Sequence, residues 1–396
     1  MKILLANFAK MLNDSGGLAK VTVAFANEMI SRGHDVVLVF SDENEGKFFY
    51  KISDSVTIYN LSYRNGRKCV FPISMKIKRE ITRVFSTANA REVNDQFMIK
   101  NYVTYIKDIL LKEKPDVIIS SQPAASRLLL LNLDVKIPVI TMSHGDPEDY
   151  FHTYPKQELA ALEKSAACQV LLPSFVNAIK RRFPKRNVVE IGNVVPQYDI
   201  KAALDTEKKI YKILFIGRLV KNHKRPHLLI EAFGKIANQF PQWIVEIWGD
   251  DGNKKYKKQL IKLIKDHRLE KVVFLKGITH DVKAVLKTGD IFVIPSAYEG
   301  FGLSLAEAMS MGVPVIGYKS CSAVNELIED KKNGILCNDG VNDLAMAMKT
   351  LMINKNMRVK FGNEARNKMK KYNSALIWKQ WESLILSVVN KKHRVR

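Results

Sequence analysis

Short apolar runs alternate with longer amphipathic segments along most of the chain. The run at residues 2–6 is followed by a glycine loop at 14–17 and then by apolar residues at helical spacing over 18–31. This alternation predicts parallel strands joined by helices that cover both faces of a sheet. The predicted strands of the first half are residues 2–6, 36–40, 116–120, 139–143 and 170–172.

The same pattern starts again after residue 210. Strands are predicted at 213–216, 244–248, 272–275, 291–294 and 315–318, with a helix at 226–239. The polar stretch 200–210 separates the two series and is the predicted linker. A chain of 396 residues is too long for one ordinary core. We therefore predict an α/β fold of two Rossmann-like domains, 1–199 and 200–374, that face each other across a cleft, followed by an amphipathic helix from residue 375.

Charge narrows the choice of partners. The formal net charge is +23, with a pI near 9.7. Nucleic acid, an anionic membrane surface and a phosphorylated substrate are the classes of partner that such an excess suggests. No recognisable DNA- or RNA-binding module interleaves aromatic and basic residues, so we expect no nucleic-acid partner.

The cysteines and the apolar runs indicate in which cellular compartment the protein is located. The four cysteines form no CxxC or Cys/His pattern, which is typical of free thiols and not of a metal site. No run reaches the roughly 18 apolar residues of a membrane span, and the N-terminal run is too short for a signal peptide. The prediction is a cytoplasmic protein, peripheral on the inner face of the cell membrane if its basic surface binds lipid.

The most informative stretch is residues 299–307, EGFGLSLAE, which follows a strand and opens a helix. Gly300 and Gly302 allow a tight turn and a close approach of a ligand. The amides of Phe301, Gly302 and Leu303 would then point out of a helix N-terminus, which suits a phosphate or a sugar hydroxyl. On these residues alone, a ligand site and a plain glycine loop with a capping glutamate remain equally open.

This stretch resembles the signature of glycosyltransferase family 4, whose members are retaining enzymes with the GT-B fold. The resemblance extends to the strand and loop ILFIGRL at 213–219 with Lys224, and to FLKG at 274–277. It also includes PVIG at 314–317, the glycine loop Gly16-Gly17 and the histidine loop SHG at 143–145. It covers nearly the whole chain and is weakest at 45–135 and 146–200. In GT-B enzymes the final helix crosses back to the first domain, which the resemblance implies for residues 375–396.

The resemblance also implies residue roles. Arg218 and Lys224 would grip the donor diphosphate, Glu307 the ribose hydroxyls, and Glu299 and His144 would act at the donor sugar as the catalytic pair. The remaining donor-binding residues would be Gly16, Gly17, Gly277, Phe301, Gly302 and Leu303. Two cations can neutralise a leaving diphosphate, so the resemblance implies no metal and no cofactor besides the nucleotide sugar. No DxD carboxylate pair stands on a suitable loop.

One departure from the family pattern lies at residues 221–226. This segment is one residue longer than the commonest spacing, and Arg225 replaces the usual glycine. Lys221 or Arg225 is therefore a further candidate for the phosphate role.

The implied function is a retaining, metal-independent transfer of a hexosyl or N-acetylhexosaminyl group. The donor would be a nucleotide sugar, with UDP favoured over GDP. The acceptor would be a glycan or a polyprenyl-linked molecule in bacterial cell-surface polysaccharide synthesis. A sugar-nucleotide epimerase and a non-catalytic sugar-nucleotide binder of the same fold remain the alternatives.

Residues 64–85 mix cations with large apolar side chains, and from Ile73 onward the apolar spacing is helical. Two interpretations are equally open: a helix that lies on an anionic bilayer surface, and an amphipathic helix packed on its own domain. The basic end of the chain, residues 390–396, would add to a membrane contact or simply extend as a tail.

Overall fold

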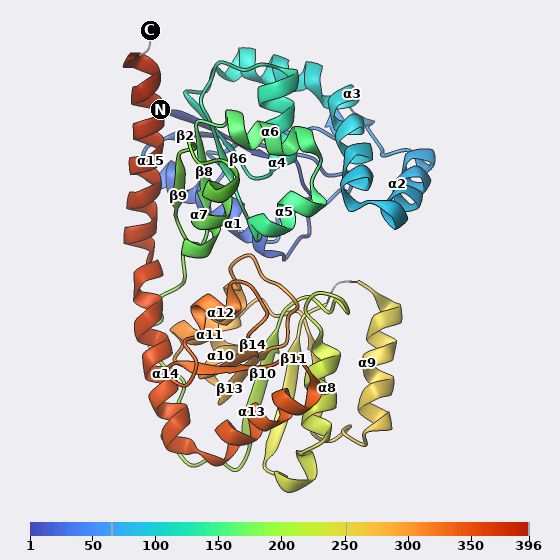
Figure 1. The fold of residues 1–396 in the computed structure, drawn as a ribbon, viewed down its shortest axis with the longest axis vertical. Coiled ribbons are helices and arrows are strands. Elements are labelled where there is room, and N and C mark those ends of the chain that lie inside the picture. The colour runs from blue at the N-terminus through green and yellow to red at the C-terminus, as the bar shows by residue number, and fades with distance from the viewer. Residues whose placement is uncertain (65, 251, 395–396) are drawn as a thin grey trace. The chain divides into compact units, whose positions relative to one another are not determined.

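The computed structural model describes residues 1–64, 66–250 and 252–394. The chain forms two compact units, one of Met1–Gly192 with Trp378–Arg396 and one of Asn193–Ile377 (Figure 1). Both are built from a parallel sheet with helices on its faces. Among the described residues, no helix is both long and apolar enough to cross a membrane.

The first unit holds a seven-stranded parallel sheet in the order β3-β2-β1-β6-β7-β8-β9. Its central strands are buried on both faces, which explains their continuous apolar runs. The strands are β1 Lys2–Asn7, β2 Asp35–Phe40, β3 Thr57–Asn60, β6 Val117–Ser120, β7 Val139–Met142, β8 Ala167–Val170 and β9 Val188–Glu190.

The strand predicted at 170–172 is wrong in position, because β8 ends where that prediction begins. Pro173 is the first residue of the following helix and keeps Leu172 extended as its N-cap. Residues 171–172 therefore form the buried connection into that helix and no part of the sheet.

The helices of the first unit vary widely in length. They are α1 Gly17–Ser31, α2 Ile73–Phe85, α3 Thr87–Glu113, α4 Pro123–Arg127, α5 Pro147–Thr153, α6 Lys156–Lys164 and α7 Pro173–Arg182, with a π-helical turn at Leu128–Asn132. A short hairpin of β4 Tyr63–Arg64 and β5 Arg67–Lys68 precedes α2. The long helix α3 packs on a core cluster that includes Phe97, Ile106 and Ile118.

The second unit holds a six-stranded parallel sheet in the order β12-β11-β10-β13-β14-β15. The strands are β10 Tyr211–Ile216, β11 Trp243–Trp248, β12 Val273–Gly277, β13 Ile291–Ile294, β14 Val315–Tyr318 and β15 Gly334–Cys337. The helices are α8 Pro226–Gly234, α9 Lys254–Asp266, α10 Val282–Lys287, α11 Leu303–Ser310, α12 Val324–Leu327, α13 Val341–Ile353 and α14 Lys355–Met369. Short 3₁₀ turns follow α8 and α14 at Ala237–Gln239 and Lys370–Tyr372.

The single helix predicted at 226–239 is divided in the structure. α8 ends at Gly234, and the 3₁₀ turn follows after two residues. Gly234 lies against the ring of His267, where an added Cβ would come 3.0 Å from Nδ1. This close approach explains the glycine, which also lowers the helix propensity at the end of α8.

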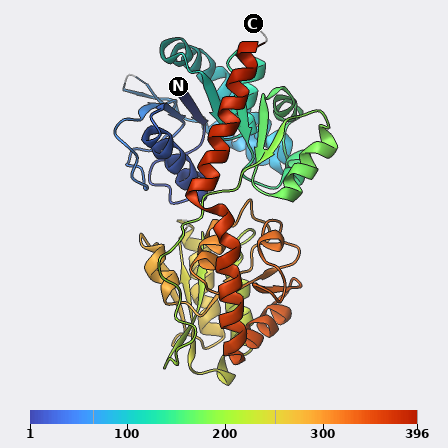
Figure 2. The same cartoon turned by 90° about the vertical axis from the view of Figure 1, so that its left-hand side faces the viewer.

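The chain passes between the two units at Gly192–Asn193 and at Ile377–Trp378. The segment predicted as a linker, 200–210, lies within the second unit, where the Ala202 amide donates to the Met311 carbonyl. The last helix, α15 Ser374–Arg394, lies alongside α1 of the first unit (Figures 1 and 2). Phe25 meets the rings of Trp378 and Trp381 edge to face at 5.6 and 5.0 Å. Residues 395–396 and the side chains of 392–394 lie outside the described part of the chain.

Candidate active site

The predicted donor-binding residues of the second unit follow the ends of its strands. Arg218 comes two residues after β10, and Glu299 stands in the loop between β13 and α11. β10 and β13 are paired neighbours in the sheet. The carboxyl ends of parallel strands lie at one edge, where ligands of such sheets bind. The fold therefore gathers these loops at a single edge of the second sheet.

A buried ion pair joins two of the predicted residues. Lys224 Nζ lies 2.5 Å from Glu299 Oε1, with 14% and 7% of the two side chains exposed. Burying both charges is costly unless each has a partner, so the pair fixes the two loops against each other. Lys224 comes from the segment before α8 and Glu299 from the segment before α11, as the motif spacing predicted.

His223 and Arg225 also tie the segment 223–225 to the loop 295–299. His223 Nε2 lies 2.8 Å from the Tyr298 carbonyl, and the two rings stack at 4.2 Å with an interplanar angle of 8°. The Arg225 guanidinium donates to the carbonyls of Pro295 and Ser296, both at 2.8 Å, and to Asp339 at 3.1 Å. Its acceptors are therefore protein groups, which leaves Lys221 as the exposed member of the two further phosphate candidates.

The backbone conformation of Arg225 bears on the departure from the family pattern at this position. Its φ is +49°, in the left-handed region that favours glycine. The arginine therefore adopts a backbone conformation that glycine adopts more easily, and its guanidinium makes three hydrogen bonds. His223 and Tyr298 were not predicted as site residues and gave no signal in the sequence. Arg225 was predicted as a further phosphate candidate, whereas its guanidinium binds protein acceptors.

Arg218 and Glu307 differ in environment. Arg218 is exposed, and its guanidinium has no acceptor among the residues that the structure describes. Glu307 is buried on α11, one turn past the helix start, with 4% of its surface exposed. Burial and then the charge of Glu307 raise the pKa of nearby Tyr198. The second unit thus presents the exposed guanidinium of Arg218 and the buried carboxylate of Glu307.

The helix start at α11 has the conformation that the glycines predicted. Gly302 is the N-cap with φ +77°, and Leu303 is the first helical residue. The first amides of a helix have no partner within it, so they are available to an acceptor at this end. Phe301 is buried and packs edge to face on Tyr372 at 5.0 Å, which gives its ring a packing role. Gly277 ends β12 with φ +75°.

The other predicted residues, Gly16, Gly17 and His144, belong to the first unit. Gly16 is the N-cap of α1, and its amide donates to Asp14 Oδ1 at 2.8 Å. A Cβ at Gly16 would lie 2.8 Å from that same oxygen, so a side chain would displace the loop. Gly17 begins α1, and His144 follows β7. β1 and β7 flank β6, so these loops share one edge of the first sheet.

The loop that carries His144 is held in place by hydrogen bonds to Tyr150. The Gly145 amide donates to the Tyr150 hydroxyl oxygen at 2.8 Å, and that hydroxyl also bonds Ser143 Oγ at 3.1 Å. Both neighbours of His144 are thereby fixed by one buried side chain. Burial lowers the pKa of His144 to about 4, so the imidazole is neutral near pH 7. Its enclosed Nε2 has no hydrogen-bond partner among the described residues.

The first unit also contains a buried acidic cluster, which was not predicted. Arg127 on α4 pairs with Glu92 at 2.6 Å and with Asp95 at 2.7 Å, both on α3. Asp95 shares a hydrogen bond with Glu158 on α6. Burial and the neighbouring Asp95 raise the pKa of Glu158. No motif links these positions, because the residues come from three separate helices.

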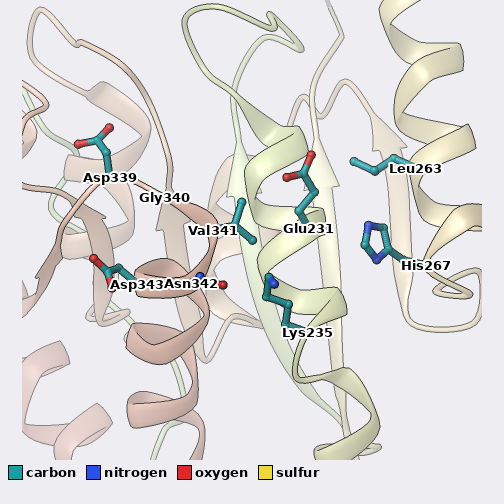
Figure 3. A pocket seen from close by; sticks show the side chains of 9 residues that line it. All are labelled: Glu231, Lys235, Leu263, His267, Asp339, Gly340, Val341, Asn342 and Asp343. Atoms are coloured by element: carbon teal, nitrogen blue, oxygen red, sulfur yellow. The ribbon is translucent and has the colours of Figure 1, made fainter.

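A pocket of about 660 Å³ lies elsewhere in the second unit, between α8, α9 and the start of α13 (Figure 3). None of the predicted site residues lines it. Its charged lining consists of Glu231, Asp339 and Asp343 against Lys235, with His267 beside them. Three carboxylates against one lysine do not suit a diphosphate, so we do not assign the donor to this pocket. Among the described residues, no group of three or more His, Cys, Asp or Glu side chains could hold a metal ion.

The fold and the strand-end loops place the chain in a known class. A family profile described as "Glycosyltransferase Family 4" matches residues 15–174, and one described as "Glycosyl transferases group 1" matches residues 197–368. The two matches together span most of the sequence. The chain belongs to glycosyltransferase family 4 and has the GT-B fold.

Individual relatives are distant. A poly(ribitol-phosphate) alpha-N-acetylglucosaminyltransferase of Staphylococcus aureus is 28% identical over 316 residues, which are 78% of this chain and 62% of that protein. A crystal structure of an S. aureus TarM mutant in complex with Fondaparinux, alpha-GlcNAc-glycerol and UDP aligns with a TM-score of 0.74 at 20% identity. That alignment covers 97% of this chain and 99% of the other. A sucrose-phosphate synthase from Thermosynechococcus elongatus aligns with a TM-score of 0.78 at 17% identity over 98% and 99% of the two chains.

Proposed function

We propose that this protein transfers a hexosyl or N-acetylhexosaminyl group from a UDP-sugar to a cell-surface glycan or its lipid-linked precursor, with retention of configuration. The observation that carries this proposal is the Lys224–Glu299 ion pair at the sheet edge that also presents Arg218. A sugar nucleotide brings two phosphates and several hydroxyls to one place, and this edge offers cations for the first and carboxylates for the second.

UDP is the proposed nucleotide. The TarM complex contains UDP, and the named S. aureus relative is an alpha-N-acetylglucosaminyltransferase. In our proposal Glu307 accepts hydrogen bonds from the ribose hydroxyls, while Arg218 and the first amides of α11 bind the diphosphate. Lys224 is already paired with Glu299, so an incoming phosphate competes with that carboxylate for the ammonium group.

The proposed reaction needs no carboxylate nucleophile. The bond between the anomeric carbon and the phosphate oxygen breaks, and its electron pair passes to that oxygen. The acceptor hydroxyl forms the new bond on the same face, and its proton goes to the leaving phosphate. Arg218 and Lys224 stabilise the charge that develops on the diphosphate. A neutral His144 has a free ring nitrogen with which to bind a sugar hydroxyl.

An anionic acceptor fits the charge of the chain. The net charge of +23 favours association with phosphate-containing polymers and with lipid-diphosphate intermediates. The S. aureus relative is named for a poly(ribitol-phosphate) acceptor. We propose that the acceptor of this chain also carries phosphate groups.

The test is a transfer assay with a panel of labelled UDP- and GDP-sugars. Acceptors would be a bacterial lipid extract and a polyol-phosphate polymer, with and without a metal chelator. Glu299→Gln keeps the shape of the side chain and removes its charge. The matched control is Glu246→Gln, which affects another ion pair of the second unit, with Lys212 at 2.9 Å.

Three results together would support the proposal. Label is transferred from one UDP-sugar, the chelator does not stop the transfer, and Glu299→Gln loses the transfer while Glu246→Gln keeps it. Transfer from a GDP-sugar only would overturn the UDP assignment. Interconversion of free sugar nucleotides without transfer would favour an epimerase. Donor binding without transfer or hydrolysis on any acceptor would favour a non-catalytic binder.

A further inference from the structure

Helix α2 exposes five large apolar side chains on one of its faces. Of its 13 residues none is buried. The exposed fractions are 75% for Ile73, 56% for Ile77, 58% for Ile81, 82% for Val84 and 84% for Phe85. At about 100° of rotation per residue these five side chains occupy a sector of roughly 120°. They therefore form one stripe along the helix, which we call the α2 stripe.

The opposite face of α2 attaches it to the first unit. Met75 packs against the core cluster that contains Phe97, and the Arg79 guanidinium donates to Asn94 on α3 at 3.3 Å. Arg79 also lies over the ring of Phe71 at 5.4 Å. Figure 1 shows α2 on the outer side of α3. The helix thus has its own packed face, and the α2 stripe is a second apolar face that the first unit does not cover.

Cations border the α2 stripe on both edges. By helical position Lys78 lies along one edge. Along the other lies Glu80, with Lys76 and Arg83 next to it. The one carboxylate of the helix, Glu80, is paired with Arg83 at 2.6 Å and with Arg79 at 3.0 Å. The preceding hairpin adds the exposed residues Arg67 and Lys68. An apolar stripe between rows of cations is the pattern of a helix that lies in a membrane interface.

We propose that the α2 stripe docks the protein on an anionic lipid surface, with its apolar side chains among the acyl chains and its cations at the headgroups. The contact is peripheral, since no described helix can span a bilayer. Basic residues next to a bilayer are attracted to anionic lipids, and the apolar stripe supplies the burial that electrostatics alone does not.

A second copy of the chain suits this surface less well. A helix of 13 residues is about 20 Å long, so its stripe offers roughly 200 Å², against about 800 Å² per partner in a stable interface. Two such helices packed on each other would also bring Lys76, Lys78 and Arg83 close to the same residues of the other copy, which is repulsive. Charge complementarity and area both favour the lipid surface.

Vesicle binding of the full chain tests this inference, and it needs neither donor nor acceptor. It therefore stands or fails separately from the proposed enzymatic function. The protein would be sedimented with vesicles of phosphatidylcholine alone and of phosphatidylcholine mixed with phosphatidylglycerol, at low and high salt. We expect binding to the mixed vesicles only, weakened by salt.

Two double variants separate the two components of binding. Ile77→Ser/Ile81→Ser should lower the partition coefficient by about ten-fold or more. Lys76→Gln/Lys78→Gln should lower it by about five-fold for each lysine. The matched controls are Met346→Ser/Ile353→Ser on α13, with 67% and 66% exposed, and Lys258→Gln/Lys262→Gln on the basic helix α9. Thermal unfolding checks that each variant folds, which is expected because the altered α2 side chains are exposed.

Three outcomes would overturn the inference. The first is no binding to the anionic vesicles. The second is equal loss in the α2 variants and in their controls, which would place the contact elsewhere or make it non-specific. The third is a wild-type dimer in analytical ultracentrifugation that becomes monomeric in Ile77→Ser/Ile81→Ser, which would assign the α2 stripe to a second copy.

Discussion

The two parallel sheets hold their functional loops in different ways. In the second unit, side chains of neighbouring loops bind each other directly, through Lys224 with Glu299 and Arg225 with Pro295 and Ser296. In the first unit, the two neighbours of His144 are bound by the hydroxyl of Tyr150, which lies on the next helix, α5. The contact of the second unit joins residues of two sequence motifs, whereas Tyr150 belongs to no motif.

The largest expected effect concerns the direct pair of the second unit. Lys224→Met and Glu299→Gln should each lower the transfer rate by roughly 10²- to 10³-fold, the usual cost of removing a group that stabilises developing charge. Because each residue is the partner of the other, we expect the double variant to be little worse than either single one. Steady-state rates of the three variants give the coupling.

The control for this cycle is the ion pair of Lys212 with Glu246, which joins β10 to β11 in the same unit. Lys212→Met and Glu246→Gln should leave the rate nearly unchanged. Strictly additive losses at Lys224 and Glu299 would contradict the view that the pair acts as a unit.

The second effect concerns the buried acidic cluster of the first unit. Burial raises the pKa of Glu158 above its ordinary value of 4.5, so the folded state binds more protons than the unfolded state above that pH. The free energy of unfolding must then fall as pH rises from 4.5 through the raised pKa, by at most about 1.4 kcal/mol per pH unit. Glu158→Gln removes this titration and should make the curve less steep. A part due to Asp95, whose pKa burial also raises, should remain.

Urea unfolding of wild type and Glu158→Gln across this pH range measures the effect. The exposed Glu163 lies on the same helix, and Glu163→Gln is the control that should follow the wild type. If Glu158→Gln were as pH-dependent as the wild type, the carboxyl group would be charged in the folded state and the assignment would be wrong.

The features that could be predicted from the sequence differ between the two units in the same way. Fold class, most strand positions and the conformation at Gly302 were predicted, because buried parallel strands have continuous apolar runs and left-handed turns favour glycine. The support of His144 was not predicted. Tyr150 lies six residues away and belongs to no motif. The buried cluster was not predicted either, because Asp95, Arg127 and Glu158 meet only through the packing of α3, α4 and α6.

The third effect tests whether Tyr150 positions His144. Tyr150→Phe keeps the ring, which stacks on Tyr154 at 4.3 Å, and removes the hydroxyl that binds Ser143 and Gly145. We expect about a ten-fold lower kcat with little change in KM, since losing such hydrogen bonds costs about 1–1.5 kcal/mol.

Tyr102→Phe is the matched control, because it removes a buried hydroxyl of the same unit, which bonds Ser41 and Ser62. It should lower stability to a similar degree without the loss in kcat. Equal kinetic effects in both variants would reduce Tyr150 to a purely structural role.

The smallest effect separates the two functions of Arg225, its left-handed backbone and its hydrogen bonds. Arg225→Ala and Arg225→Gly both remove the guanidinium that holds the loop before Glu299. Only glycine relieves the backbone cost of φ +49°, which is about 1 kcal/mol for other residues. Glycine should therefore be more stable than alanine by about that amount in thermal unfolding, and both should be less stable than the wild type. An alanine variant as stable as the glycine variant would mean that the backbone leaves the left-handed region once the guanidinium is gone. The left-handed turn at residue 225 would then depend on the hydrogen bonds of the Arg225 guanidinium.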